Sequence, residues 1–155
     1  MIVVDGDLLD VTEGLVAHQV NCRGVMGAGV ARVIAKRYPV VERVYREHCA
    51  DMEPLSLLGT TLVVVATDVE PPEEDLLVAN VFGQLDPGRG LQTDYAAVSA
   101  ALDGLSRWWG DRDRPTLHVP YMMGCGLAGG DWDIYSELLD ESWPGGVVAH
   151  RLVPR

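Results

Sequence analysis

The chain has 155 residues, of which 48% are hydrophobic, a fraction that excludes a disordered chain and suffices for one buried core. Its formal net charge of −11 at pH 7 repels nucleic-acid backbones, so we expect no nonspecific nucleic-acid binding unless a local basic patch overrides the repulsion. Cys22, Cys49 and Cys125 are widely spaced and form no C-x-x-C pair, which excludes a disulfide framework.

The sequence carries no sign of export or membrane attachment. Its first residues form a strand-like run without a basic segment or a cleavage site, and its longest apolar runs are too short to cross a bilayer. No His or Cys spacing typical of metal ligands appears, so we predict no metal site and no bound cofactor. We expect a cytoplasmic protein with one domain over residues 1–155, acting as a monomer.

Six short β-branched or apolar runs predict strands, and several of them are followed by Gly or Pro. In chain order they cover residues 1–4, 15–21, 61–67, 76–82, 116–121 and 147–153. Between them, apolar residues at three- and four-residue spacing predict helices that include residues 30–34, 98–109 and 134–139. His18 and His118 fall inside strand patterns, which favours core or interstrand roles for both.

Residues that start or stop helices flank the predicted helical segments. Pro39 would stop the first helix, and Thr93 with Asp94 can cap the second. Asp131 can cap the third, which Pro144 closes. Strands that alternate with helices predict a layered α/β fold with a largely parallel sheet, whose ligands bind beyond the carboxyl ends of the strands.

Three glycine-rich loops stand out: "GDLLD" at 6–10, "NCRGVMGAGVA" at 21–31 and "GCGLAGG" at 124–130. Two of them lead from a strand directly into a helix. In that position glycines permit positive φ and close approach, while the free N–H groups of the following helix favour phosphate. The acidic stretch at 68–75, in contrast, is typical of a solvated turn.

The third loop contains G-x-G-x-x-G at Gly124, Gly126 and Gly129. The acidic residue that a Rossmann fold places about 20 positions later is missing, since that position falls near His150. A P-loop is excluded as well, because no Gly-Lys-Ser or Gly-Lys-Thr follows any glycine run. Glycines that serve only packing and turns remain the alternative for a single loop, but two such loops together favour a diphosphate ligand.

The segments "GDLLD", "VNCRGVMGAGVARVIAKRYP" and "VPYMMGCGLAGGDW" occur in this order along nearly the whole chain, and together they resemble the macrodomain family. The likeness is greatest to the branch with the terminal ADP-ribose glycohydrolases and the DNA ADP-ribosyl glycohydrolases, whose first loop also reads M-G-x-G-[IV]-A. The resemblance implies a three-layer α/β/α fold around a mixed, roughly six-stranded sheet, with ADP-ribose in a cleft across the strand ends. ADP-ribose and ADP-ribosylated macromolecules would be its partners.

By the same resemblance, Asp7 would accept a hydrogen bond from the adenine amine, beside the backbone of Leu8, and Asn21 would reach the distal ribose. Turn capping by Asp7 and satisfaction of a strand end by Asn21 are the structural alternatives. Further ligand contacts would come from the two long motifs and the strand between them, at Met26, Gly27, Ala28, Gly29, Val30, Phe82, Gly124, Cys125, Gly126, Leu127, Ala128, Gly129 and Gly130.

Two positions depart from the pattern of that branch. Gln84 stands where its catalytic lysine would align, and Ala128 stands at its aspartate. Glutamine can orient water but cannot form a Schiff base, so a hydrolase of this sequence would act through a positioned water. The polar groups available are Asn21, Gln84, Asp86 and Asp131; the alternatives are a loop role for Gln84, a turn for Asp86 and a helix cap for Asp131.

Three functions are compatible with these residues. The one we favour is hydrolysis of mono-ADP-ribosyl linkages, above all carboxylate esters on protein, with ADP-ribosylated nucleic acid as a further acceptor. The second is a non-catalytic ADP-ribose-binding module, which the missing lysine and aspartate would suit. The third is an ADP-ribose 1″-phosphate phosphatase, because "NVFGQ" is similar to sequences in that branch. Cys22 and Cys125 lie inside the loops, but without an evident base we expect buried thiols and not nucleophiles.

Overall fold

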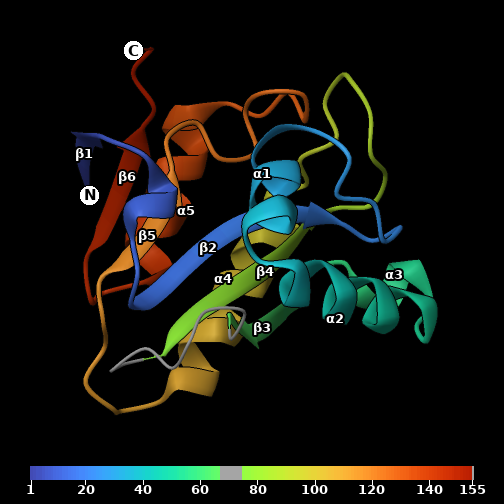
Figure 1. Cartoon of the computed structure of the whole chain (residues 1–155), viewed down its shortest axis with the longest axis horizontal. Coiled ribbons are helices and arrows are strands. Elements are labelled where there is room, and N and C mark those ends of the chain that lie inside the picture. The colour runs from blue at the N-terminus through green and yellow to red at the C-terminus, as the bar shows by residue number, and fades with distance from the viewer. Residues whose placement is uncertain (67–74, 155) are drawn as a thin grey trace.

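The computed structural model describes residues 1–66 and 75–154, which form a six-stranded sheet between two layers of helices (Figure 1). The strands lie in the order β1-β6-β5-β2-β4-β3. Every neighbouring pair is parallel except β3 with β4, so the sheet is mixed. The strand bounds are β1 Ile2–Asp5, β2 Gly14–Asn21, β3 Thr61–Val65, β4 Leu76–Gln84, β5 Leu117–Pro120 and β6 Val147–Arg151.

Helices cover both faces of this sheet. A short 3-10 helix, η1, spans Leu8–Asp10, and the α-helices are α1 Gly29–Arg37, α2 Pro39–Ala50, α3 Pro54–Leu57, α4 Tyr95–Trp109 and α5 Trp132–Ser142. In Figure 1, α1 and α2 lie on the near face and α4 and α5 on the far one. None of the helices within residues 1–66 and 75–154 is long and apolar enough to cross a membrane.

Alternation along the central strands produces two separate cores. Val16 and Val20 of β2 pack with buried residues of α1, α2 and α3, whereas Leu15 and Ala17 pack with those of α4 and α5. The same alternation holds in β4. The prediction of a three-layer α/β/α fold around a mixed six-stranded sheet is thereby confirmed.

The predicted helix boundaries are correct in most places. Asp94 caps α4 by accepting from the backbone N–H of Ala97, and Asp131 caps α5 by accepting from two backbone N–H groups of its first turn. The suggested capping by Thr93 is wrong, because its hydroxyl donates to the carbonyl of Gly124 instead. Most of the predicted acidic turn, residues 68–74, lies outside the described residues.

The sequence patterns did not predict α2, α3 or η1. Pro39 does end α1, as expected, but it is also the first residue of α2, a position that suits proline because its missing N–H has no partner there in any helix. Val41 and Tyr45 then lie four residues apart and are fully buried. Because the sequence analysis treated Pro39 only as a stop signal, it missed α2, which begins at this residue.

Two polar side chains, His18 and Asn80, lie opposite each other on β2 and β4 and are buried. Nδ2 of Asn80 donates to the carbonyl of Leu62, so its Oδ1 faces Nε2 of His18 at 2.7 Å, and that ring nitrogen carries the proton. Burial lowers the pKa of His18 to about 4, although the bond to Asn80 acts in the opposite direction. His18 is therefore neutral at pH 7 and serves the interstrand role that the sequence favoured.

We predict that His18 makes the fold less stable in acid. Because the pKa of His18 is about 4 in the folded chain and near 6.5 in the unfolded chain, the unfolded state binds the extra proton between these values. The free energy of unfolding should fall by about 3 kcal/mol from this residue between pH 7 and pH 4. Urea titrations of the wild type and His18→Gln across this range measure the effect, and identical pH dependence in both proteins would contradict it.

Candidate functional site

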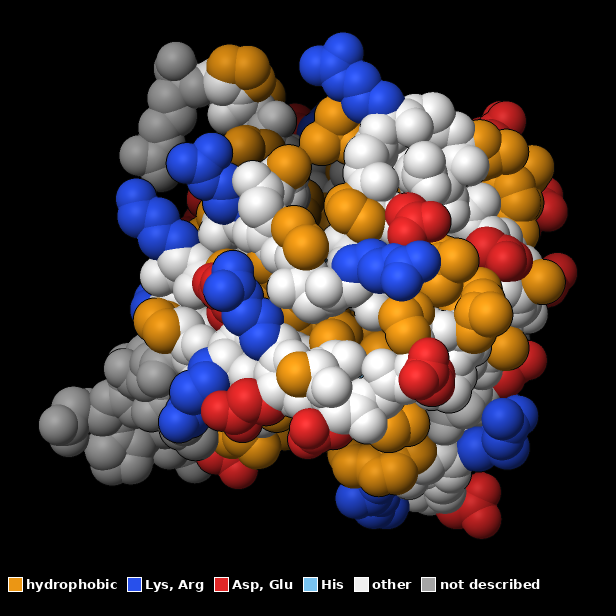
Figure 2. Space-filling view, turned by 90° about the vertical axis from the view of Figure 1, so that its right-hand side faces the viewer, with side chains coloured by type: hydrophobic (Ala, Val, Ile, Leu, Met, Phe, Trp, Pro, Cys, Tyr) orange, Lys and Arg blue, Asp and Glu red, His pale blue; other side chains and the backbone are white. Residues whose placement is uncertain are grey.

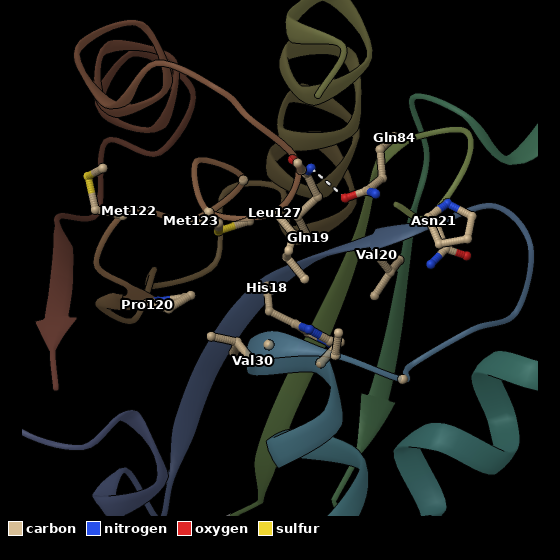
Figure 3. Close-up of a pocket in the computed structure, with 18 of the residues that line it drawn as sticks. His18, Gln19, Val20, Asn21, Val30, Gln84, Pro120, Met122, Met123 and Leu127 are labelled. Atoms are coloured by element: carbon tan, nitrogen blue, oxygen red, sulfur yellow. Dashed lines mark hydrogen bonds between the residues drawn. The ribbon is translucent and has the colours of Figure 1, made fainter. Parts of the chain in front are cut away.

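A cleft opens at the carboxyl ends of β2, β4 and β5, with a volume of about 390 Å³, a size typical of small-molecule sites. Figure 3 shows Asn21 and Gln84 at one end and Pro120 and Met122 at the other. Among the described residues that line it, none is Asp, Glu, Lys or Arg. The lining comprises residues 18–21, 25, 27–31, 84, 87–88, 120–124 and 126–128.

The side chain of Asn21 organises the loop between β2 and α1. Its Nδ2 donates to the carbonyl of Val25 at 2.7 Å, and its Oδ1 accepts from the backbone N–H of Arg23 at 2.9 Å. The buried hydroxyl of Tyr45 donates to the Asn21 carbonyl at 2.7 Å. Asn21 thus holds the loop in shape, as the structural alternative proposed, and it also lines the cleft.

The first turn of α1 forms one wall of the cleft. Ala28 occupies the N-cap position and offers no capping side chain, so the first N–H groups of the helix have no side-chain partner there. Residues 27–31 line the cleft directly. The positive end of a helix dipole therefore borders a space free of charged side chains, which is an arrangement suited to an anion.

The opposite wall is formed by residues 124–130 after β5, the second glycine loop that borders the cleft. The loop is closed by the backbone N–H of Gly130, which donates to the Gly124 carbonyl at 2.9 Å. Gly129 has φ of 69°, and a Cβ there would lie 2.5 Å from the carbonyl oxygen of Gly90, so only glycine fits. A Cβ on Gly126, in contrast, would meet no atom within 4 Å, and this residue borders the open cleft.

A hydrogen-bonded network centred on Gln19 joins these walls beneath the cleft. Nε2 of Gln19 donates to Oε1 of Gln84 at 2.9 Å, a bond drawn in Figure 3, and to Oγ1 of Thr93 at 2.9 Å. The hydroxyl of Tyr135 donates to Oε1 of Gln19 at 2.9 Å. The sequence analysis missed Gln19, although the polar run His18, Gln19 and Asn21 inside a strand-like segment was a visible signal.

Several residues predicted for the site lie elsewhere. Phe82 departs from its predicted place: it is fully buried, stacks on Tyr45 on the α2 side of the sheet and is not among the residues that line the cleft. Met26 is also buried in that core, and Leu8 packs there from η1. Cys125, Gly129 and Gly130 belong to the second loop but are not among the lining residues.

The three predicted aspartates have structural partners. Asp7 accepts from the backbone N–H of Leu9 and caps η1, which contacts β5. Asp86 pairs with Arg23 at 2.7 Å on the surface. Asp131 caps α5. Neither Asp86 nor Asp131 lines the cleft, which leaves Asn21 and Gln84 as the predicted polar groups that do.

The thiols near the cleft are poor nucleophiles. Burial raises the pKa of Cys22 and that of Cys125 to about 11 each, so both are protonated at pH 7. Within the described residues, no group of three or more His, Cys, Asp or Glu side chains is arranged to hold a metal ion.

The charge of the protein is unevenly distributed. Five of its 12 basic residues are exposed on α1 and α2, where they outnumber the acidic ones. Figure 2, which views the side of the molecule that carries α2 and α3, shows Lys and Arg side chains among acidic and apolar ones. The basic residues are Arg32, Lys36, Arg37, Arg43 and Arg46. These two helices therefore carry more positive than negative charge, in contrast to the chain as a whole.

Comparison with known proteins identifies relatives over nearly the whole chain, although no family model matches it. The ADP-ribose 1″-phosphate phosphatase of Debaryomyces hansenii is 32% identical, with 81% of this chain and 80% of that protein covered. The macrodomain of Mycobacterium tuberculosis DarG superposes with a TM-score of 0.77 at 21% identity, covering 99% of this chain and 97% of that one. Thermosipho africanus DarTG in complex with ADP-ribose gives a TM-score of 0.78 at 19% identity, covering 99% of this chain and 42% of that one.

These two structural matches establish a common fold. The curated relative adds sequence identity over most of both chains, and it extends the likeness beyond the fold. Together with the glycine loops that form the two walls of the cleft, these relationships show that the chain belongs to the macrodomain family.

Proposed function

We propose that this macrodomain binds ADP-ribose in the cleft and hydrolyses a bond to the anomeric carbon of the distal ribose. The observation that carries the proposal is the cleft itself, which lies between the first turn of α1 and the second glycine loop and has no charged lining residue among those described. A diphosphate between these walls would be held by backbone N–H groups, because no Lys or Arg is among the described lining residues.

The two ends of the cleft differ in a way that would orient ADP-ribose. η1 contacts β5, and Asp7 acts electrostatically on His150, the partner of Pro120 in the sheet, so Asp7 lies toward the Pro120 end, where adenine would be placed. The distal ribose would then lie at the opposite end, beside Asn21 and Gln84. This orientation agrees with the roles that the family resemblance implies for Asp7 and Asn21.

The hydrolytic step would rely on a neutral carboxamide. Of the hydrogen bonds described, Gln84 uses one lone pair of Oε1 toward Gln19 and one hydrogen of Nε2 toward the carbonyl of Asp86. One lone pair and one hydrogen remain to hold a water beside the anomeric carbon. The water oxygen forms the new bond to that carbon, the acceptor leaves with the electron pair, and the released proton passes to solvent.

The absence of an acid among the described lining residues favours a particular class of acceptor. With no carboxyl or ammonium group in the lining to protonate it, the leaving group would depart most readily as a stable anion. A glutamate side chain with an ordinary pKa of about 4.3 does so readily, whereas a serine alkoxide does not. A carboxylate ester on protein is therefore the substrate that we favour.

A second candidate is hydrolysis of ADP-ribose 1″-phosphate. It is favoured by the 32% identity to the Debaryomyces hansenii protein, whose name states that activity. Phosphate also leaves as a stable anion, so the same uncharged cleft suits it.

ADP-ribose binding should depend on open space at Gly126. In Gly126→Glu the new side chain meets no protein atom at Cβ, so the fold should persist while a carboxylate enters the cleft and repels the diphosphate. We expect saturable binding of ADP-ribose to the wild type by calorimetry and none to this variant. Gly104→Glu on α4, away from the cleft, is the matched control and should bind normally. Unchanged binding to Gly126→Glu would overturn the proposed position of the diphosphate.

Activity should follow the acceptor and depend on Gln84. We expect release of ADP-ribose from glutamate-linked ADP-ribosylated protein or from the 1″-phosphate, and slower release from thymidine-linked ADP-ribosylated DNA. Gln84→Ala should lower kcat at least about tenfold with little change in affinity, because it removes a group that positions water. Gln92→Ala, at a glutamine outside the cleft lining, is the control. If the protein binds ADP-ribose but releases it from none of these substrates, it is a non-catalytic ADP-ribose-binding module and the proposed hydrolysis is wrong.

A further inference from the structure

The side chain of Gln19 occupies a space that two glycines leave open. A Cβ on Gly83 of β4 would lie 2.6 Å from Oε1 of Gln19, and a Cβ on Gly124 would lie 2.7 Å from the same atom. A Cβ on Gly124 would also collide with the ring of Tyr135, which is fully buried. Glycine at both positions is therefore required for a glutamine at position 19 to reach its partners.

The donors and acceptors around Gln19 can be arranged in only one sense. The carbonyl of Gly124 can only accept, so the Thr93 hydroxyl donates to it at 2.6 Å and must accept from Gln19. Nε2 of Gln19 therefore faces Thr93, and its Oε1 faces the Tyr135 hydroxyl.

The same logic fixes Gln84. Its Oε1 accepts from Nε2 of Gln19, and its own Nε2 donates to the carbonyl of Asp86 at 2.8 Å, which again can only accept. The backbone carbonyls of Asp86 and Gly124 thus set the direction of every hydrogen bond in the chain of side chains between them. If the Gln19 amide were reversed, its Oε1 would face two acceptors, Oε1 of Gln84 and Oγ1 of Thr93.

We infer that Gln19 is a positioning residue for the reaction, which fixes the orientation of the Gln84 carboxamide and couples it to the second glycine loop. The inference rests on the proposed function of Gln84. Through Thr93, the loop that would hold the diphosphate and the amide that would hold the water belong to one network. Gln19 lines the cleft floor between them but needs no contact with the anomeric carbon.

Gln19→Glu tests this inference because it retains the shape of the side chain and removes its donors. A carboxylate at this position faces the acceptor Oε1 of Gln84, so the Gln84 amide must either move away from it or turn and give up its bond to the Asp86 carbonyl. At pH 7.5 we expect kcat to fall at least about tenfold while the Kd for ADP-ribose changes less than about threefold. As the pH is lowered to 5, the ratio of variant to wild-type kcat should rise, because protonation of the introduced carboxylate restores one donor. Gln92→Glu is the matched control and should follow the wild type.

A second readout does not require catalysis. The chain has three glutamines and two asparagines, so its side-chain amide spectrum contains only five groups. In Gln19→Glu the ¹H–¹⁵N signals of the Gln84 amide should shift, and in Gln92→Glu they should stay in place. If the wild type binds ADP-ribose but hydrolyses nothing, the proposed function fails, and the Gln84 signals still decide whether Gln19 orients this amide.

An unshifted Gln84 amide in a folded Gln19→Glu variant, or wild-type kcat with a flat pH ratio, would overturn the inference. Should thermal melting show that Gln19→Glu does not fold, Tyr135→Phe provides the same test. It removes only the hydroxyl that donates to Oε1 of Gln19 and leaves the buried ring in place. The Gln84 amide signals should again shift, and unchanged signals would count against the inference in the same way.

Discussion

Parallel pairing of β2 with β4 on one side and β5 on the other is the interaction on which the rest of the site depends. Parallel strands end at the same edge of a sheet, so segments far apart in the chain meet there without any long excursion. Here the meeting brings together the loop after Asn21, the end of β4 at Gln84 and the glycine loop after Pro120. Each wall of the cleft is formed by the segment that directly follows one of these strands.

An uncharged site in an acidic protein has consequences for both binding and chemistry. Attraction to an anion must come from backbone dipoles, whose position is fixed by the fold and whose charge does not change with pH. Near pH 7 two titratable side chains around the cleft are also uncharged, since His18 is neutral and the Cys22 thiol is protonated. Under the proposed function, such a site would select substrates by the stability of the leaving group, because its lining holds no carboxyl or ammonium group to supply or remove a proton.

Much of the architecture could be predicted from the sequence because its signals are local. β-branched runs located all six strands, and Asp94 and Asp131 marked helix starts. The glycine loops were identified for the same reason. Helix α2 was missed because Pro39 ends one helix and begins the next, and a single residue was given only one role.

The remaining differences arise from contacts between distant segments. Phe82 was assigned to the ligand, but Tyr45 of α2 packs on its ring and buries it, a contact between distant segments that a single sequence does not state. Gln19 was missed because its partners, Gln84, Thr93 and Tyr135, lie 65, 74 and 116 residues away. The functional residues of a cleft formed by several strands are recognised only when those strands are placed side by side.

The space left by Gly83 and Gly124 also limits how this cleft can be redesigned. Alanine at either position would compete for the volume that holds the amide of Gln19, although only Gly124 of the two lines the cleft. The residues at positions 19, 83 and 124 lie on two strands and a loop, and the size of each limits the size of the others. A redesign that enlarges one of these glycines must replace the glutamine as well, and with it the means by which the two halves of the site stay aligned.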